Sequence, residues 1–287
     1  MLFRSPLRPR IRAEFASRCC ISRPQWQYRR VSETFPRQKA ATRNFQLGAP
    51  RGFAISADAS LVAFLRSEHG RDPVTALWAY DVGEKVERRI ADPRNLLADS
   101  DDIPAAERAR RERMREQAAG ITAFTTDDSG TVAAFALAGQ LFFANLRSGT
   151  VNQLAATGPI IDPRISPDGQ RIAWSTGPEV RIIEINGTGE RVIADELAFG
   201  SGTPSDTVSW GLADFIASEE LGRMHGMWWS PESDALVVER CDESPVKRIW
   251  LSDPTIPDRE PREYRYPYAG TPNADVRLVW VTLNGQQ

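Results

Sequence analysis

The sequence predicts an all-β fold, a partial β-propeller of about four blades with two short helical insertions. A unit made of a strand, a tight polar turn and a second strand recurs from Phe53 onward, with turns anchored at Ser56, Thr126, Ser166 and Ser230. These anchors are 70, 40 and 64 residues apart, and about 40 residues is the length of one four-stranded blade. A β-sandwich would explain alternating strands, but not a turn that returns at blade-like intervals.

Each recurring unit has the residues of a β-hairpin. In the third unit Pro167 presets the backbone at the second turn position, and Asp168 and Gly169 close the reversal. Apolar segments follow each turn at regular offsets. We expect strands at residues 61–64, 77–80, 132–135, 141–144, 172–174, 180–183 and 235–238.

The two longer intervals are predicted to contain the helical insertions. The first covers about residues 104–118, between the start signal Pro104 and the stop signal Gly120. It is polar on nearly every face, and Glu107 can pair with Arg111 at i,i+4 spacing. Such a helix buries little apolar surface, so it either projects into solvent or presents its arginines to a ligand.

The second insertion is predicted to be a helix within residues 208–224. Leu212, Phe215 and Ile216 fall on one helical face, and Gly222 is a stop signal. This apolar face indicates that the helix packs against the blades.

Two adjacent carboxylates, Glu219 and Glu220, fall in the last turn of this second helix. Both acids oppose the helix dipole there, which is unfavourable unless a cation lies nearby. Two carboxylates can hold one ammonium group by charge-assisted hydrogen bonds, and a free α-amine offers three N–H donors. A glutamate pair on a helix is also a common feature of solvated surfaces, so the pair alone leaves both interpretations open.

The first 43 residues differ in composition from the rest of the chain. They contain ten arginines and one lysine but only two glutamates, and no uninterrupted apolar run of the kind that a secretory signal needs. They resemble an organelle transit peptide superficially. We predict that residues 1–43 form a basic, disordered extension or an over-long start of the reading frame, and that residues 44–287 form the propeller domain.

Composition excludes several classes of function. A hydrophobic content of 41% with 26% charged residues is typical of a globular protein, and no stretch approaches the length of a membrane-spanning helix. No aromatic-interleaved basic motif, phosphate-binding glycine loop or zinc-spaced Cys/His pattern occurs. We therefore expect no nucleic acid, no membrane, no metal and no cofactor among its partners.

The cysteine and arginine contents predict the setting of the chain. Three cysteines, two of them adjacent in the basic extension, do not make a disulfide framework, which indicates a reducing cytoplasm. Arginine outnumbers lysine 33 to 3, which suggests a GC-rich coding sequence. We expect a cytoplasmic protein of bacterial origin.

The region around the glutamate pair resembles the amine-recognition region of the dipeptidyl peptidase IV family of serine peptidases. The resemblance extends over about residues 45–284 and is most specific in residues 209–276. It rests on four segments: residues 210–220 with the glutamate pair, the Trp-Trp-Ser-Pro run at 228–231, the Asp-Glu-Ser-Pro-Val run at 242–246, and the Tyr-Pro-x-Ala-Gly-x-x-Asn segment at 266–273.

This resemblance implies roles for particular residues. In the family, a double glutamate in the propeller binds the free amino terminus of the substrate, so that dipeptides are released, preferentially after proline. Glu219 and Glu220 would inherit that role. The family also uses an arginine that reaches a substrate carbonyl, and the resemblance implies Arg115, or else Arg113, for this contact. The implied partners are peptide amino termini and a hydrolase domain or chain.

The sequence departs from the complete family pattern. No Gly-x-Ser-x-Gly turn occurs, and the only histidines are His69 and His225. We therefore expect the family's Ser/Asp/His triad and its α/β-hydrolase domain to be absent, and the chain to be inactive by itself. His69 is expected in an exposed loop. His225 is either a turn residue or a contact of the glutamate pair.

Two hypotheses follow for the function. The chain is either the substrate-recognition part of a dipeptidyl aminopeptidase, truncated before its catalytic domain, or a non-catalytic propeller that binds peptide termini or acts as a scaffold. Residues 273–281 are expected to be an opening strand left without partners. Because unpaired strand edges favour association, we expect the isolated chain to be marginally folded or to self-associate through its open ends.

Overall fold

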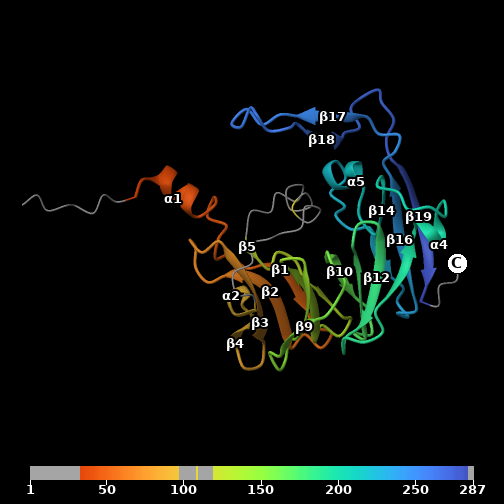
Figure 1. Cartoon of the computed structure of the whole chain (residues 1–287). Coiled ribbons are helices and arrows are strands. Elements are labelled where there is room, and N and C mark those ends of the chain that lie inside the picture. Colours follow the sequence, from red (N-terminus) through yellow and green to blue (C-terminus); the bar gives the residue numbers. More distant parts are fainter. Residues whose placement is uncertain (1–32, 97–107, 109–118, 284–287) are drawn as a thin grey trace, which may run out of the picture.

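A computed structural model describes residues 33–96, 108 and 119–283. Four larger sheets, antiparallel except for one two-residue strand, succeed one another along the described residues (Figure 1). These sheets are the blades of a partial propeller, as predicted. The first two blades consist of β1 (Arg51–Ile55), β2 (Leu61–Ser67), β3 (Val74–Asp81) and β4 (Val86–Ala91), then β6 (Thr125–Thr126), β7 (Val132–Leu137), β8 (Gln140–Asn145) and β9 (Val151–Leu154).

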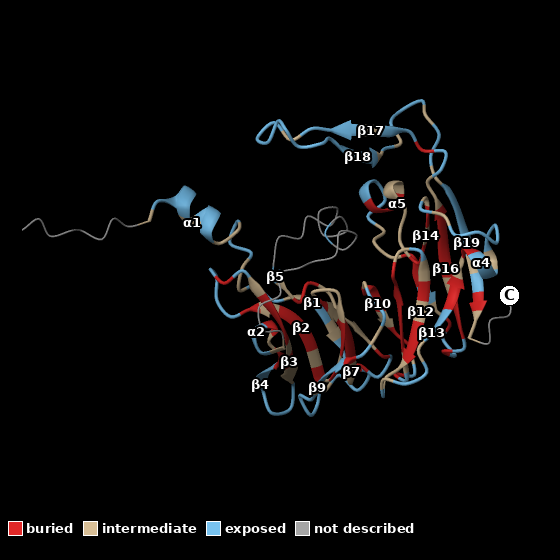
Figure 2. Cartoon of the chain, in the orientation of Figure 1, coloured by how far each residue is buried: buried red, intermediate tan, exposed pale blue. Residues whose placement is uncertain are grey.

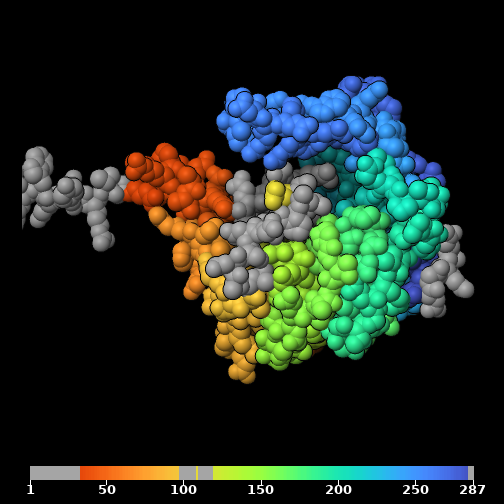
Figure 3. All heavy atoms as spheres, in the orientation of Figure 1, coloured from red at the N-terminus to blue at the C-terminus, as the bar shows by residue number. Residues whose placement is uncertain are grey.

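The third blade follows the same order and the fourth departs from it. The third consists of β10 (Ile161–Ile165), β11 (Arg171–Ser175), β12 (Glu179–Glu184) and β13 (Arg191–Asp195). The fourth consists of β14 (Val208–Trp210), β15 (Met227–Trp229), β16 (Ala235–Asp242) and β19 (Asp275–Thr282). A separate hairpin of β17 (Arg248–Leu251) and β18 (Arg262–Arg265) projects beyond the blades as an arm (Figure 3).

A side-chain oxygen holds the turn that opens each hairpin, by accepting a hydrogen bond from the start of the next strand. In three blades a serine Oγ accepts a hydrogen bond from the backbone N–H five residues later, at 2.9 to 3.1 Å. These pairs are Ser56 with Leu61, Ser166 with Arg171, and Ser230 with Ala235. In the second blade Asp127 takes this place, since its Oδ1 accepts from Val132 N–H at 3.0 Å. The predicted anchor Thr126 is therefore one residue too early.

The turns of neighbouring blades are bonded to one another. Each bond joins the turn of one blade to the turn of the next, which sets the spacing of the blades. The bonds are Ala57 N–H to Ser129 O at 3.1 Å, Asp128 N–H to Pro167 O at 3.0 Å, and Asp168 N–H to Ser233 Oγ at 3.0 Å.

The core lies between the blades, where apolar faces of adjacent sheets pack together (Figure 2). The layer between the first two blades contains Phe135 and Phe142, whose rings stack with centroids 5.4 Å apart. Trp174 is fully buried in the next layer, and Trp210 in the layer between the third and fourth blades. Burial of large side chains between sheets is the main stabilising term of such a fold.

The second insertion is not one helix. Its first residues form β14, and only Phe215–Glu219 are helical, as α5. β14 and β15 pair with the same edge of β16, β14 at residues 240–242 and β15 at residues 236–238. Residues 211–226, called the 211–226 insertion below, therefore interrupt a single edge strand. The helical spacing of Leu212, Phe215 and Ile216 does not extend to residues 208–210, where Val208 and Trp210 alternate with Ser209 as in a strand and are buried in the core.

The prediction of an unpaired strand at residues 273–281 is wrong. β19 pairs antiparallel with β16 along its whole length, from Ala235 opposite Thr282 to Asp242 opposite Asp275. The arm lies between the two strands in the sequence, so that local patterns could not show their pairing.

Two other predicted segments lie partly outside the described residues. Residues 35–41 form α1 (Phe35–Ala41), so the predicted disorder of residues 1–43 does not hold there, while residues 1–32 are outside. The first insertion is also outside, except for Arg108. The remaining short elements are α2 (Pro93–Leu96), β5 (Ala119–Gly120), which pairs in parallel with β3, and α4 (Glu196–Phe199). No helix of the described residues is long and apolar enough to cross a membrane.

Candidate functional site

The glutamate pair lies at the end of α5, as the sequence predicts. Glu219 is the last residue of the helix, and Glu220 is its C-cap with helical backbone angles. Both residues are exposed. Glycine at 222 adopts a φ of +67°, a left-handed conformation that turns the chain away after the helix. The two carboxylates are therefore presented to solvent at the point where the helix stops.

Side-chain contacts fix the short helix that carries the pair. At the start of α5, Asp214 Oδ2 accepts hydrogen bonds from the backbone N–H of Ile216 at 3.0 Å and of Ala217 at 3.3 Å. On another side, the ring of Phe215 meets Tyr266 edge to face, with centroids 5.2 Å apart. A five-residue helix is not stable alone, so these contacts decide its position.

The two tryptophans after the insertion lie in different environments, because successive residues of a strand point to opposite faces of the sheet. Trp228 is 38% exposed, and the Arg223 guanidinium lies 5.6 Å from the centroid of its ring. Trp229 is half-buried and donates from Nε1 to Arg164 O at 3.0 Å. Trp228 is thus a ledge beside the insertion, and Trp229 is a contact between blades.

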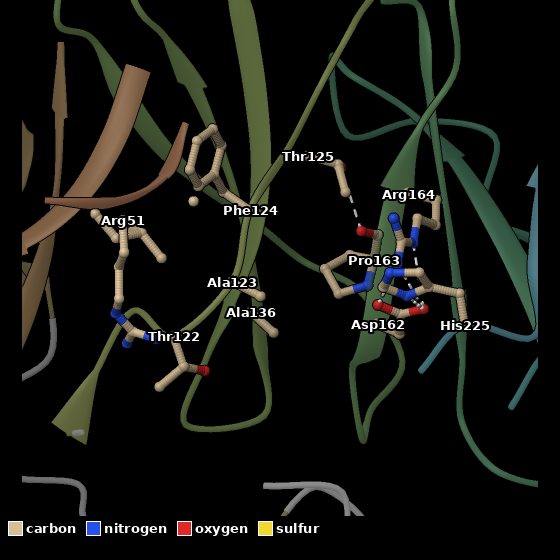
Figure 4. Close-up of a pocket in the computed structure, with 12 residues that line it drawn as sticks. Arg51, Thr122, Ala123, Phe124, Thr125, Ala136, Asp162, Pro163, Arg164 and His225 are labelled. Atoms are coloured by element: carbon tan, nitrogen blue, oxygen red, sulfur yellow. Dashed lines mark hydrogen bonds and ion pairs between the residues drawn. The ribbon is translucent and has the colours of Figure 1, made fainter. Parts of the chain in front are cut away.

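A cavity of about 290 Å³ lies among the first strands of three blades (Figure 4). Arg51 and Phe124 line one side, and Asp162, Arg164 and His225 line the other. The cavity combines apolar wall residues with charged groups on two opposite sides, as small-molecule sites do.

His225 connects the 211–226 insertion to the third blade. Its Nδ1 lies 3.0 Å from Asp162 Oδ2, and Arg164 Nη2 lies 2.9 Å from Asp162 Oδ1. Asp162 has a φ of 49°, a strained conformation for a residue other than glycine. The sequence left two interpretations of His225, a turn residue or a contact of the glutamate pair. Among the described residues, its side chain forms a hydrogen bond with Asp162 and none with Glu219 or Glu220.

The comparison with protein families decides the membership of the chain. Residues 127–287, more than half of the chain, match the model of the dipeptidyl peptidase IV (DPP IV) N-terminal region. The chain belongs to this family.

Individual relatives agree with the family. Human dipeptidyl peptidase 8 is 31% identical over 129 residues, which covers 40% of this chain and 14% of that protein, and the mouse protein of the same name matches to the same extent. The crystal structure of Porphyromonas gingivalis dipeptidyl peptidase 4 superimposes with a TM-score of 0.55 at 19% identity, over 82% of this chain and 31% of that one. The chain thus has the fold of the DPP IV N-terminal region and spans less than a third of the length of these relatives.

The described structure includes only part of the predicted site. Glu219 and Glu220 lie within the residues that match the DPP IV family model. Arg113 and Arg115 precede those residues and also lie outside the described residues. Their predicted contact with a substrate carbonyl stays a prediction.

Sequence reasoning missed Asp162 and Glu239 as residues of this region. Asp162 shows no sequence signal, since nothing local relates it to His225. Glu239 had one: it is a lone acid directly after the apolar residues 235–238 of a predicted strand. A charge in such a place needs a partner, which the structure shows to be Arg223.

Proposed function

We propose that this chain is the substrate-recognition part of a dipeptidyl aminopeptidase, and that Glu219 and Glu220 bind the free α-ammonium group of a peptide. One observation carries the proposal: two adjacent, exposed carboxylates end a capped helix that protrudes from the edge strand of a blade. Two carboxylates supply enough acceptors for the donors of one ammonium group.

The proposed substrates are peptides with a free amino terminus and proline or alanine at the second position. If the amino terminus is held at a fixed place, the peptide bond after the second residue is the one that reaches the catalytic groups. Arg115, or else Arg113, would contact a substrate carbonyl. The cutting itself is assigned to a hydrolase domain or a separate hydrolase chain, through a serine activated by a histidine and an aspartate.

Neutralising the glutamate pair is expected to abolish the recognition of free amines. The probe is an Ala-Pro-Ala peptide with a fluorescent label at its carboxyl end, compared with its N-acetylated form by fluorescence anisotropy. We expect Glu219→Gln and Glu220→Gln each to weaken binding by about tenfold or more, the loss of one charge-assisted hydrogen bond. The acetylated peptide should bind no better to the parent chain than to the variants.

Glu232→Gln is the matched control, because Glu232 is an exposed glutamate in the fourth blade outside the 211–226 insertion. It should leave the affinity unchanged. Equal binding of the free and acetylated peptides to the parent chain would contradict the proposal.

A non-catalytic propeller that binds peptide termini or acts as a scaffold is the alternative. The two functions share the amine site and differ in turnover. We expect the purified chain by itself to release no chromophore from a Gly-Pro reporter. If the chain is part of a dipeptidyl aminopeptidase, activity should appear only when a hydrolase domain or chain is added. We place this function in the cytoplasm of a bacterium.

Self-association through the fourth blade is a further expected property. Val276, Leu278 and Trp280 of β19 are exposed together, at 39%, 63% and 51%. Contiguous exposed apolar side chains favour association. Sedimentation velocity should show a sedimentation coefficient that rises with concentration, and the variant Leu278→Glu/Trp280→Glu should reduce that rise. A monomer at every concentration would contradict this expectation.

A further inference from the structure

Glu239 is a charged residue in the centre of a core strand. It lies in the middle of β16, is 0% exposed, and has Val238 and the fully buried Leu236 as strand neighbours. Burial raises the pKa of its carboxyl group, and the hydrogen bond from Arg223 opposes that rise. Replacing such a buried ion pair with apolar residues is often neutral or stabilising in proteins. The stability of the blade therefore does not explain this carboxylate.

Glu239 stands where the 211–226 insertion leaves the sheet and where it returns. Its backbone oxygen accepts from Gly211 N–H at 2.8 Å, and its N–H donates to Gly226 O at 2.7 Å. β14 ends opposite Arg240, and β15 begins opposite Val238. One residue of β16 thus holds both ends of the insertion.

The side chain of Glu239 holds the interior of the same insertion. Oε1 accepts from Asp214 N–H at 2.9 Å, and Oε2 accepts from Arg223 Nη1. Arg223 also donates from Nη2 to Asp214 Oδ1 at 3.2 Å and from Nη1 to His225 O at 2.7 Å. Asp214 begins α5 and Arg223 follows it, so Glu239 fixes both ends of the helix that carries Glu219 and Glu220.

We propose that Glu239 is the positioning residue of the amine site, acting through Asp214 and Arg223 to hold α5 and its two terminal carboxylates in the geometry that binds an α-ammonium group. The proposal rests on the proposed function of Glu219 and Glu220. The two hydrogen bonds that its carboxylate accepts, from Asp214 and Arg223, both lead into the insertion rather than to the rest of the blade. A site held by such a supporting contact loses affinity when the contact loosens.

The first test is Glu239→Gln in the full chain, with the labelled Ala-Pro-Ala peptide and its acetylated form as probes. Glutamine keeps the size of the side chain and removes its charge. We expect the affinity for the free-amine peptide to fall at least about tenfold. Hydrogen exchange should accelerate at the amides of Glu220 and Arg223, which donate to Ile216 O and Ala217 O.

A second variant keeps the test valid if Glu239→Gln does not fold. Arg223→Met/Glu239→Gln removes both charges together, so neither remains buried without its partner. We expect this double variant to fold, and its affinity for the free-amine peptide to be at least about tenfold lower than that of the parent chain.

Asp242→Asn is the matched control. Asp242 is on the same strand, and its hydrogen-bond partners Thr207 and Ser244 lie outside the insertion. Neutralising it should change neither the affinity nor the exchange of the 211–226 insertion. A fall in affinity with Asp242→Asn as large as with Glu239→Gln would indicate a general weakening of β16 and overturn the proposal.

The outcomes separate this inference from the function on which it rests. Amine-dependent binding that Glu239→Gln and the double variant leave unchanged would overturn the positioning role alone. A melting temperature lowered by Glu239→Gln, with the affinity of the folded chain intact, would do the same, since it would show a purely structural role. No amine-dependent binding by the parent chain would overturn the proposed function and the positioning role with it.

Discussion

Arg240→Ala is expected to destabilise the chain by about 3–5 kcal/mol, because it would leave Glu196 buried without a counter-charge. Arg240 on β16 donates from Nε to Glu196 Oε2 at 2.9 Å and from Nη2 to Oε1 at 2.7 Å. The two side chains are only 11% and 6% exposed. Since Glu196 begins α4 after the third blade, the pair joins the third blade to the fourth.

Urea unfolding measures this loss of stability: the urea concentration at the midpoint of unfolding should fall, while the dependence of the unfolding free energy on urea concentration stays the same. The double variant Arg240→Met/Glu196→Gln should recover most of the stability, because it buries no unpaired charge. Arg277→Ala is the control: Arg277 and Asp275 form a pair that is 67% and 47% exposed, so its loss should have a much smaller effect. A loss with Arg240→Ala no larger than with Arg277→Ala would contradict the expectation.

The same pair predicts how stability depends on pH. The bonds from Arg240 lower the pKa of Glu196 from 4.5 to about 2. A carboxyl group whose pKa is lower in the folded state contributes stability that is complete above its unfolded pKa and is lost as pH falls through its folded pKa. The contribution should disappear between about pH 4.5 and pH 2, and Glu196→Gln should show a shallower loss of stability over this interval.

Gly226→Ala is expected to destabilise the chain by about 3 kcal/mol and to displace the insertion. A Cβ at this position would lie 2.5 Å from Gly211 C and from Leu212 N and C. All of these are backbone atoms, so no side chain can move aside. The chain leaves and re-enters the sheet through a gap that only a glycine fits.

The effect can be separated from ordinary glycine flexibility within the same insertion. Gly222 has a φ of +67° but nothing within 4 Å of an added Cβ. Gly222→Ala should therefore show only the conformational penalty, about 1–2 kcal/mol. Thermal unfolding of both variants measures the difference. A smaller loss with Gly226→Ala than with Gly222→Ala would show that the gap is wider than the structure indicates.

Much of the fold was predictable because its signals are local. Pro167, Asp168 and Gly169 specify a reversal within a few residues, and the apolar strands that follow such turns have their predicted places in the blades. The turn of the second blade was misplaced by one residue, since Asp127 and Thr126 are both able to accept a hydrogen bond from the next strand.

The errors arose where the partner of a segment is distant in sequence. Strand β19 was expected to be unpaired, because the arm separates it from β16. β14 was included in the expected helix because the helical spacing of Leu212, Phe215 and Ile216 was extended back to Val208. Periodicity over a few residues does not distinguish these cases.

The sequence alone determined the blade repeat, the family resemblance and the place of Glu219 and Glu220 at the end of a helix, because each depends on residues that are near neighbours in the chain. Only the tertiary structure decided what holds that helix. Glu239 meets Gly211, Gly226 and Arg223 because β16 pairs along one edge with both halves of an interrupted strand. Pairing between strands is set by packing across the whole blade, and no local pattern contains it.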